Sequence, residues 1–287
     1  MEEHAIVRLL GLAILCSGSF ALSGLALAAD ATVAKDDIEM IAVPSGEFLM
    51  GSNDPDADAD EKPASKVFVG AFSIDKFEVT SARYLRCIEA DSCTRLVTQR
   101  YDDTTKANLP ATIVSWQQAM TYCRWVGKRL PTEAEWEKAA RGTNGRRYPW
   151  GNSFEPERAN VGYTAGTTAV GSFSKGTSPY GVMDMAGNVW EWTSSLYKPY
   201  PYDPSDGRED PNAKGSRVER GGSWYHPPWQ ARTSRRTAAG HIYRRANDLG
   251  FRCAKQLHFP ESSMPSPIHC GPIRRATQNR MTPAGFS

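Results

Sequence analysis

The sequence predicts an α+β domain with little regular secondary structure. Three capped helical segments lie between residues 80 and 142, and short strand-like runs precede them between residues 37 and 77. From Gly142 to residue 252 few segments are periodic, and the chain's 24 glycines and 19 prolines favour turns and loops. Because such a backbone cannot satisfy its polar groups by ladders alone, we expect disulfides, side-chain hydrogen bonds or ions to hold it.

Residues 1–28 are typical of a signal peptide. Arg8 precedes an apolar run, and the run ends in Ala26-Leu27-Ala28, which offers a small-x-small cleavage pattern. A lipid anchor on Cys16 is the alternative, but the residue before it is bulky where such a site needs a small one. We therefore expect cleavage after Ala28, a periplasmic or secreted protein, and no membrane span in the mature chain.

The mature chain has a balanced charge. Cleavage removes Glu2, Glu3 and Arg8, which changes the formal net charge from +2 to +3. This surplus does not predict nucleic-acid binding, and the sequence indicates no particular oligomeric state. We expect one domain over residues 37–255 and a flexible tail over residues 256–287, which lacks periodicity.

Short strands are expected in MIAVPSGEFLMGS and KVFVGAFSIDKFEVT, where apolar runs alternate with turns. Between them, DPDADADEKP spaces Asp54, Asp56 and Asp58 as a calcium-binding loop would. However, Ala59 stands where that loop needs glycine, and Ser65 stands where it needs its closing glutamate. We therefore expect a solvated acidic loop.

Three helices are predicted from their N-terminal caps. Thr80 precedes SARYLRCIEA, and capping boxes precede AMTYCRWVG and WEKAARG. The first box pairs Ser115 with Gln118, and the second pairs Thr132 with Glu135.

Five cysteines remain after cleavage, without any CxxC pair. In an oxidising compartment such cysteines form bridges more often than zinc sites. Cys87 and Cys93 could close a local loop, and Cys123 and Cys253 could tie two distant segments. Cys270, in the tail, would then stay free.

Four stretches together resemble the formylglycine-generating enzyme domain, also called the sulfatase-modifying factor domain. They are GEFLMGS with FEVT, WVGKRLPTEAEWEKAARG, YGVMDMAGNVWEWT, and RVERGGSW ending in DLGFRCA. The resemblance extends from about Met40 to Ala254. It implies a variant of the C-type lectin fold, which agrees with the loop-rich pattern, and it supports a disulfide between Cys123 and Cys253.

The resemblance also implies structural calcium. By position the ion would take the side chains of Asp184 and Glu191 and the carbonyls of Gly187 and Val189, and calcium prefers such oxygen ligands. The alternative is that Glu191 pairs with an arginine. A second calcium site would begin at Asn160 and Val161, but the sequence that follows lacks the acidic residue that family members supply.

The sequence departs from the family at the copper site. Family enzymes bind copper(I) through two cysteine thiolates after GGS, and thiolates select that soft ion. No cysteine lies between Cys123 and Cys253 here, and His226 stands at the position of the first family cysteine. We therefore do not expect copper.

The segment after GGS still provides candidate catalytic residues. Ser223, Trp224, Tyr225 and His226 are expected to line the family's cleft, where His226 could act as a general base or as a metal ligand. A histidine among aromatics can also simply hydrogen-bond within a packed wall. A two-histidine, one-carboxylate iron site is the weaker metal alternative and would need His241 beside His226.

An arginine surplus marks residues 217–252. We take Arg232 and Arg235 as candidates to bind an anionic group of the substrate, and Trp190 as a further candidate substrate-binding residue. Other arginines of this stretch are structural in the family.

The sequence favours an exported maturation or oxidation factor for a periplasmic peptide, siderophore precursor or redox protein. This hypothesis rests on analogy with secreted family members implicated in pyoverdine maturation and nitrite-reductase assembly. The second hypothesis is a non-catalytic, lectin-like binding module. The third, formylglycine formation on sulfatases, ranks last because the copper ligands are missing.

Overall fold

The computed structural model describes residues 38–96, 103–238 and 245–257. The predicted signal peptide and nearly all of the tail lie outside this part, so those boundaries stay predictions. The strands are β1 (Met40–Val43), β2 (Gly46–Met50), β3 (Ser65–Val69), β4 (Phe72–Asp75), β5 (Trp190–Leu196), β6 (Arg217–Arg220), β7 (Arg236–Ala238), β8 (Leu249–Gly250) and β9 (Ala254–Gln256). The helices are α1 (Ser81–Glu89), α2 (Trp116–Trp125) and α3 (Glu133–Arg141), and the 3-10 turns are η2 (Ala59–Glu61), η3 (Thr104–Lys106), η4 (Pro156–Arg158), η5 (Ser174–Gly176) and η6 (Pro228–Ala231). None of these helices has the length and apolar character needed to cross a bilayer.

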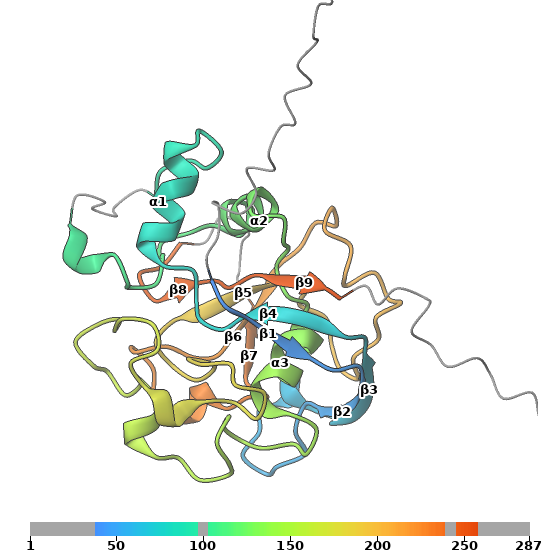
Figure 1. Cartoon of the computed structure of the whole chain (residues 1–287). Coiled ribbons are helices and arrows are strands. Elements are labelled where there is room, and N and C mark those ends of the chain that lie inside the picture. Colours follow the sequence, from blue (N-terminus) through green and yellow to red (C-terminus); the bar gives the residue numbers. More distant parts are fainter. Residues whose placement is uncertain (1–37, 97–102, 239–244, 258–287) are drawn as a thin grey trace, which may run out of the picture.

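Three small sheets organise the described chain. Their strand orders are β1-β4-β9, β2-β3 and β7-β6-β5-β8, and only the β5–β8 pairing among them is parallel. Figure 1 shows α1 and α2 together at one end of the domain, and α3 beside β2 and β3 nearer the other end. The long irregular segment between α3 and β5 lies away from α1 and α2. This mixed, loop-rich architecture confirms the predicted fold class.

The helices begin where their caps predicted. The side chain of Thr80 accepts a hydrogen bond at the start of α1, and complete capping boxes open α2 at Ser115 and α3 at Thr132. Each cap satisfies backbone N–H groups that have no partner within the helix. These boundaries are local, and short-range sequence patterns were sufficient to find them.

Strand β5 separates two hydrophobic cores. Trp190 and Trp192 pack with α1 and α2 in one core, whereas the Glu191 side chain points the other way and accepts a hydrogen bond from Trp136 of the second core at 2.9 Å. Alternate residues of a strand face opposite sides. The two tryptophans therefore lie on the opposite face of β5 from Glu191.

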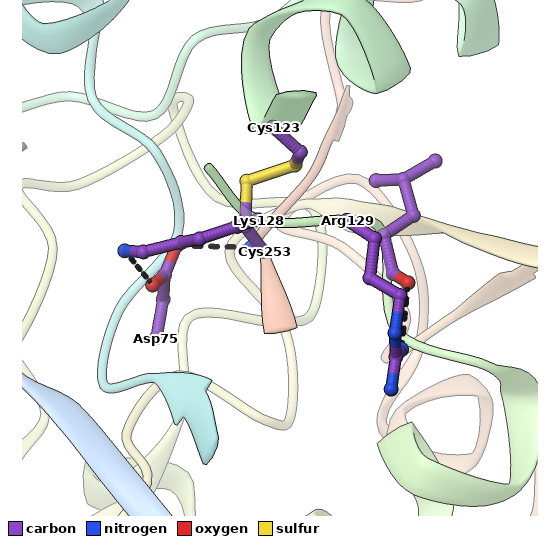
Figure 2. The surroundings of a disulfide bond; sticks show 6 residues. Asp75, Cys123, Lys128, Arg129 and Cys253 are labelled. Carbon is purple, nitrogen blue, oxygen red and sulfur yellow. Dashed lines mark hydrogen bonds and ion pairs between the residues drawn. A yellow bond between two sulfur atoms is a disulfide. The ribbon is translucent and has the colours of Figure 1, made fainter. Parts of the chain in front are cut away.

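Both expected disulfides are present. Cys123 of α2 bonds to Cys253, 130 residues away, and Cys87 bonds to Cys93. Figure 2 shows Asp75 beside the longer bridge, where its carboxylate accepts hydrogen bonds from the Cys253 N–H at 2.9 Å and from Lys128 at 2.6 Å. In the chain-entropy treatment a bridge over such a loop stabilises by about 4 to 5 kcal/mol.

Buried ion pairs join α3 to β6 and β7; we call them the arginine-paired cluster. Glu133 receives two hydrogen bonds from Arg236, at 2.7 and 3.0 Å. Glu137 pairs with both Arg141, at 2.7 Å, and Arg220. All five side chains are buried, so each carboxylate in the cluster has its countercharge in direct contact.

The acidic loop is more buried than the sequence predicted. Glu61 is fully buried and accepts hydrogen bonds from Arg232 and Ser234, both at 2.6 Å. Asp56 pairs with Arg147 and Asp58 pairs with Arg235. Arginines from distant segments therefore fix a loop that composition alone made look solvated.

Candidate functional site

The segment that begins at Ser223 is held in place by its backbone. Gly222 has a φ of +72°, and a Cβ atom there would lie 2.8 Å from the Gln230 carbonyl, so glycine is required at this turn. The Trp224 N–H donates to the Asn188 carbonyl at 3.0 Å, and the His226 carbonyl accepts from the Gly162 N–H at 2.8 Å. The segment is thus clamped between the GNVWEW motif and the loop that follows Asn160.

Ser223, His226 and Asp248 form a hydrogen-bonded group. The Ser223 hydroxyl lies 2.7 Å from His226 Nδ1 and 2.9 Å from the Asp248 carboxylate, and Asp248 itself lies 3.5 Å from Nδ1. The Trp190 indole N–H is 3.2 Å from the same Nδ1 atom. Because Ser223 is fully buried between its two partners, it is placed to position the imidazole rather than to attack a substrate.

His226 opens onto a pocket of about 400 Å³. The pocket is lined by Trp224, Tyr225, His226, Asn247 and Asp248. A second hollow of about 360 Å³ adjoins it and shares Trp224 and Asn247. The Nε1 atom of Trp224 is buried and has no hydrogen-bond acceptor in the part of the chain that the structure describes.

The structure brings together the four candidate catalytic residues, with Trp190 behind them. Trp190 is almost fully buried and reaches the pocket only through His226. The two candidate anion-binding arginines do not line this pocket. Arg232 and Arg235 bind the acidic loop instead, through Glu61 at 2.6 Å and Asp58 at 2.7 Å, so neither guanidinium is presented to a ligand here.

A second buried acidic group, the Glu78 cluster, lies behind the GNVWEW motif and comprises Glu78, Asp184, Asn188 and Asn160. Asn188 donates to one Glu78 oxygen at 3.2 Å, whereas the other Glu78 oxygen is buried and has no hydrogen-bond donor within the described residues. Burial raises the pKa of Glu78 well above its usual range, and the charge of Asp184 raises it further. Burial likewise raises the pKa of Asp184, although the Gly171 N–H donates to it at 2.6 Å.

The residues expected to bind calcium fit an ion only in part. Both Glu191 oxygens receive hydrogen bonds from Arg252, each at 2.7 Å, which is the arginine pairing that the sequence left open. The Gly187 and Val189 carbonyls accept no hydrogen bond from the described chain. The two carbonyls and one Glu78 oxygen therefore keep accepting capacity within the described chain, whereas Glu191 is already neutralised.

At the expected second calcium position the Asn160 side chain is fully engaged. Its amide donates to the Gly166 carbonyl at 2.9 Å and to Asn188 at 3.2 Å, and its oxygen accepts from the Thr164 hydroxyl at 2.7 Å. Val161 packs against a small apolar cluster. These contacts hold the loop that follows Asn160 against the GNVWEW motif.

No thiol lies near His226 among the described residues. The cysteines described there are all in disulfides, and Cys270 lies outside that part of the chain. His241, needed for the iron alternative, also lies outside it. Asp248 supplies a carboxylate beside His226, but the second histidine of such a site is not described.

Nothing in the sequence indicated that two residues, Asp248 and Glu78, belong to the site. Asp248 was read as part of the DLGFRCA motif, and Glu78 as part of FEVT, so neither was considered as a site residue. They lie too far along the chain from His226 and Asp184 for a short sequence pattern to connect them. Asn188 has a φ of +59°, which reflects the turn that places it between Glu78 and Asn160.

Comparison with known proteins identifies close relatives over the same span. Residues 27–257 match the family described as the sulfatase-modifying factor enzyme 1-like domain. The chain is 33% identical to inactive C-alpha-formylglycine-generating enzyme 2 of Bos taurus, over 79% of this chain and 91% of the relative. It is 32% identical to the formylglycine-generating enzyme of Thermomonospora curvata, over 75% and 92%. Among solved structures, PvdO from Pseudomonas aeruginosa superposes with a TM-score of 0.65 at 28% identity, over 77% of this chain and 95% of that one.

Proposed function

Because the chain belongs to the sulfatase-modifying factor enzyme 1-like family, we propose that it is an exported maturation or oxidation factor for a periplasmic peptide, siderophore precursor or redox protein. The observation that carries this proposal is the pocket built around His226, at the place where family enzymes have a copper ligand. The two disulfides fit a secreted or lumenal protein.

In this proposal His226 moves a proton to or from the bound substrate. Ser223 and Asp248 hold the Nδ1 side of the ring, which fixes its orientation. The exposed ring of Tyr225, which lines the pocket, would cover the bound substrate.

To test the proposal, the full mature protein is incubated with a periplasmic extract from cells that lack this protein, and the extract is searched for a converted substrate. Mass spectrometry should reveal a mass change that depends on added protein and disappears with His226→Ala. Ser223→Ala should reduce the rate less, because Asp248 still faces the ring. Unchanged thermal unfolding of both variants would show that the loss is local. A product formed equally by His226→Ala would contradict the assignment.

A non-catalytic binding module is the second candidate. A relative named as inactive, 33% identical over nearly its whole length, favours it. A binder would retain a substrate-like molecule with saturable affinity and yield no product. Tyr225→Ala, which removes an exposed ring that lines the pocket, should then weaken retention.

Formylglycine formation on sulfatases remains the third candidate. It would require copper(I) held by thiolates, whereas the cysteines that the structure describes are bonded to one another. A cysteine peptide should therefore stay unconverted in the presence of copper and oxygen.

We also propose that the Glu78 cluster binds structural calcium. Asp184 and the carbonyls of Gly187 and Val189 would hold the ion, as the family resemblance implies, and Glu78 would supply further negative charge. The support is the Glu78 oxygen that is buried without a donor in the described chain, since hard cations prefer carboxylate and carbonyl oxygens. The ion would stabilise the GNVWEW turn, in which the Asn188 carbonyl accepts the hydrogen bond from the Trp224 N–H. It would take no part in the reaction.

A further inference from the structure

A separate pocket of about 400 Å³ is lined by residues of α2, the turn into α3, α3 itself, β5 and the segment after β5. Its apolar lining includes Met120, Leu130 and Pro211, and its polar lining includes Arg124, Ser194 and Glu209. It shares no lining residue with the pockets around His226. The proposed function makes no use of it.

Glu209 gives this pocket its chemical character. One of its carboxylate oxygens accepts from the Ser195 hydroxyl at 2.6 Å and from the Tyr202 hydroxyl at 2.7 Å. The other has only the Ser194 hydroxyl, at 3.4 Å. Its hydrogen bonds therefore come from neutral hydroxyls, and one oxygen retains most of its accepting capacity. Burial raises the pKa of this carboxyl, as expected for an acid without a countercharge in contact.

Arg124 and Arg129 both line this pocket, and Arg129 and Arg217 lie near enough to Glu209 to interact with its charge, although neither forms an ion pair with it. Arg129 makes two hydrogen bonds of 2.6 Å to Glu135, which neutralises both groups. Arg217 donates to the backbone carbonyls of Ser194 and Ala213, at 2.6 and 2.7 Å. Arg124 is exposed at the edge of the pocket.

We propose that this pocket binds an alkylammonium or alkylguanidinium group, such as the side chain of a basic residue in a peptide. The cationic head would bond to the less satisfied oxygen of Glu209 and to Ser194, and its aliphatic stem would lie on Met120, Leu130 and Pro211. A charge-assisted hydrogen bond in a partly desolvated pocket is stronger than one between neutral groups. The site is distinct from the pocket at His226, so this inference does not depend on the proposed function.

The test is calorimetric titration of the full mature protein with n-pentylamine and n-pentylguanidine. Pentan-1-ol and hexanoate serve as neutral and anionic probes of the same length. We expect the two cations to bind and both other probes to bind at least tenfold more weakly, or about 1.4 kcal/mol.

Removing the charge of Glu209 and removing the charge of Arg124 should change the cation affinity of the pocket in opposite directions. Glu209→Gln keeps an acceptor for Ser195 and Tyr202 but removes the charge, so cation affinity should fall by about tenfold or more. Arg124→Ala removes a repelling charge at the rim and should raise the affinity slightly. Glu157→Gln, which removes an exposed carboxylate elsewhere, is the matched control and should have no effect.

Two results would overturn the proposal. The first is equal cation affinity in wild type and Glu209→Gln, with both proteins unfolding at the same temperature. The second is preferred binding of hexanoate that is lost in Arg124→Ala, which would make the pocket an anion site.

Discussion

The arginine-paired cluster and the Glu78 cluster are both buried groups of carboxylates, but their charge is balanced in different ways. Glu133 and Glu137 each touch a guanidinium directly. Glu78 and Asp184 have amide and backbone donors and each other, while Arg252 is bonded to Glu191. The pKa of Glu78 is accordingly raised well above its usual range by burial and by the charge of Asp184.

This difference separates a structural role from a binding role. A carboxylate that is fully paired has no capacity left for a ligand, and its function is to join segments of the chain. A buried pair of acids without a cation in contact instead favours either protonation or the arrival of a positive ion. The same comparison distinguishes Glu61, bound by Arg232, from Glu209, which has hydroxyl partners only.

The largest effect should come from breaking the arginine-paired cluster. Arg220→Met leaves Glu137 and Glu133 buried with less countercharge, and we expect the free energy of unfolding to fall by about 3 to 5 kcal/mol. Urea denaturation followed by circular dichroism measures it. The double variant Arg220→Met/Glu137→Gln should lose less than the sum of the single variants, because it removes both charges. Additive losses would contradict direct pairing.

Calcium binding at the Glu78 cluster should have an intermediate effect on the free energy of unfolding. At a free calcium concentration of one hundred times Kd, the protein should gain about 2.7 kcal/mol over its state in chelator. Asp184→Asn should abolish the gain, since it removes an ion ligand, and Glu78→Gln should reduce it. Paired urea titrations with calcium and with EDTA provide the measurement.

Glu157→Gln is the control for the calcium experiment and should retain the full gain. An equal gain in Asp184→Asn would place the ion elsewhere. No gain in the wild type would mean that the two acids share a proton instead.

The smallest effect should be the pH dependence contributed by Glu209 in the absence of amines. Its pKa in the folded protein is raised by burial above the ordinary value of 4.5. Its stabilising contribution is therefore complete below about pH 4.5 and is lost as the pH rises through the folded-state value. Urea denaturation between pH 4 and pH 8 should show wild type losing stability relative to Glu209→Gln as the pH rises. A difference that stays constant, or that grows in favour of wild type, would contradict the shift.

Much of the fold could be predicted because its signals are local or are carried by ordered motifs. Thr80, Ser115 and Thr132 cap helices through bonds that span three residues, and alternation along β5 placed Trp190 and Glu191 on opposite faces. The candidate site was predicted less completely. His226 and Ser223 were found from the motif, but Asp248 lies 25 residues from Ser223 along the chain, and its role depends on how β8 is positioned beside β5.

The sequence by itself determined the family, the helix starts and the absence of cysteines between Cys123 and Cys253, and it indicated the two disulfide pairs. The tertiary structure alone decided which acids meet arginines: Glu191 meets Arg252 across 61 residues, and Arg232 meets Glu61 across 171. The physical reason is the distance along the chain over which each interaction acts. Caps and alternation depend on neighbours a few residues apart, whereas the partner of a buried charge depends on which distant segments the whole fold brings into contact.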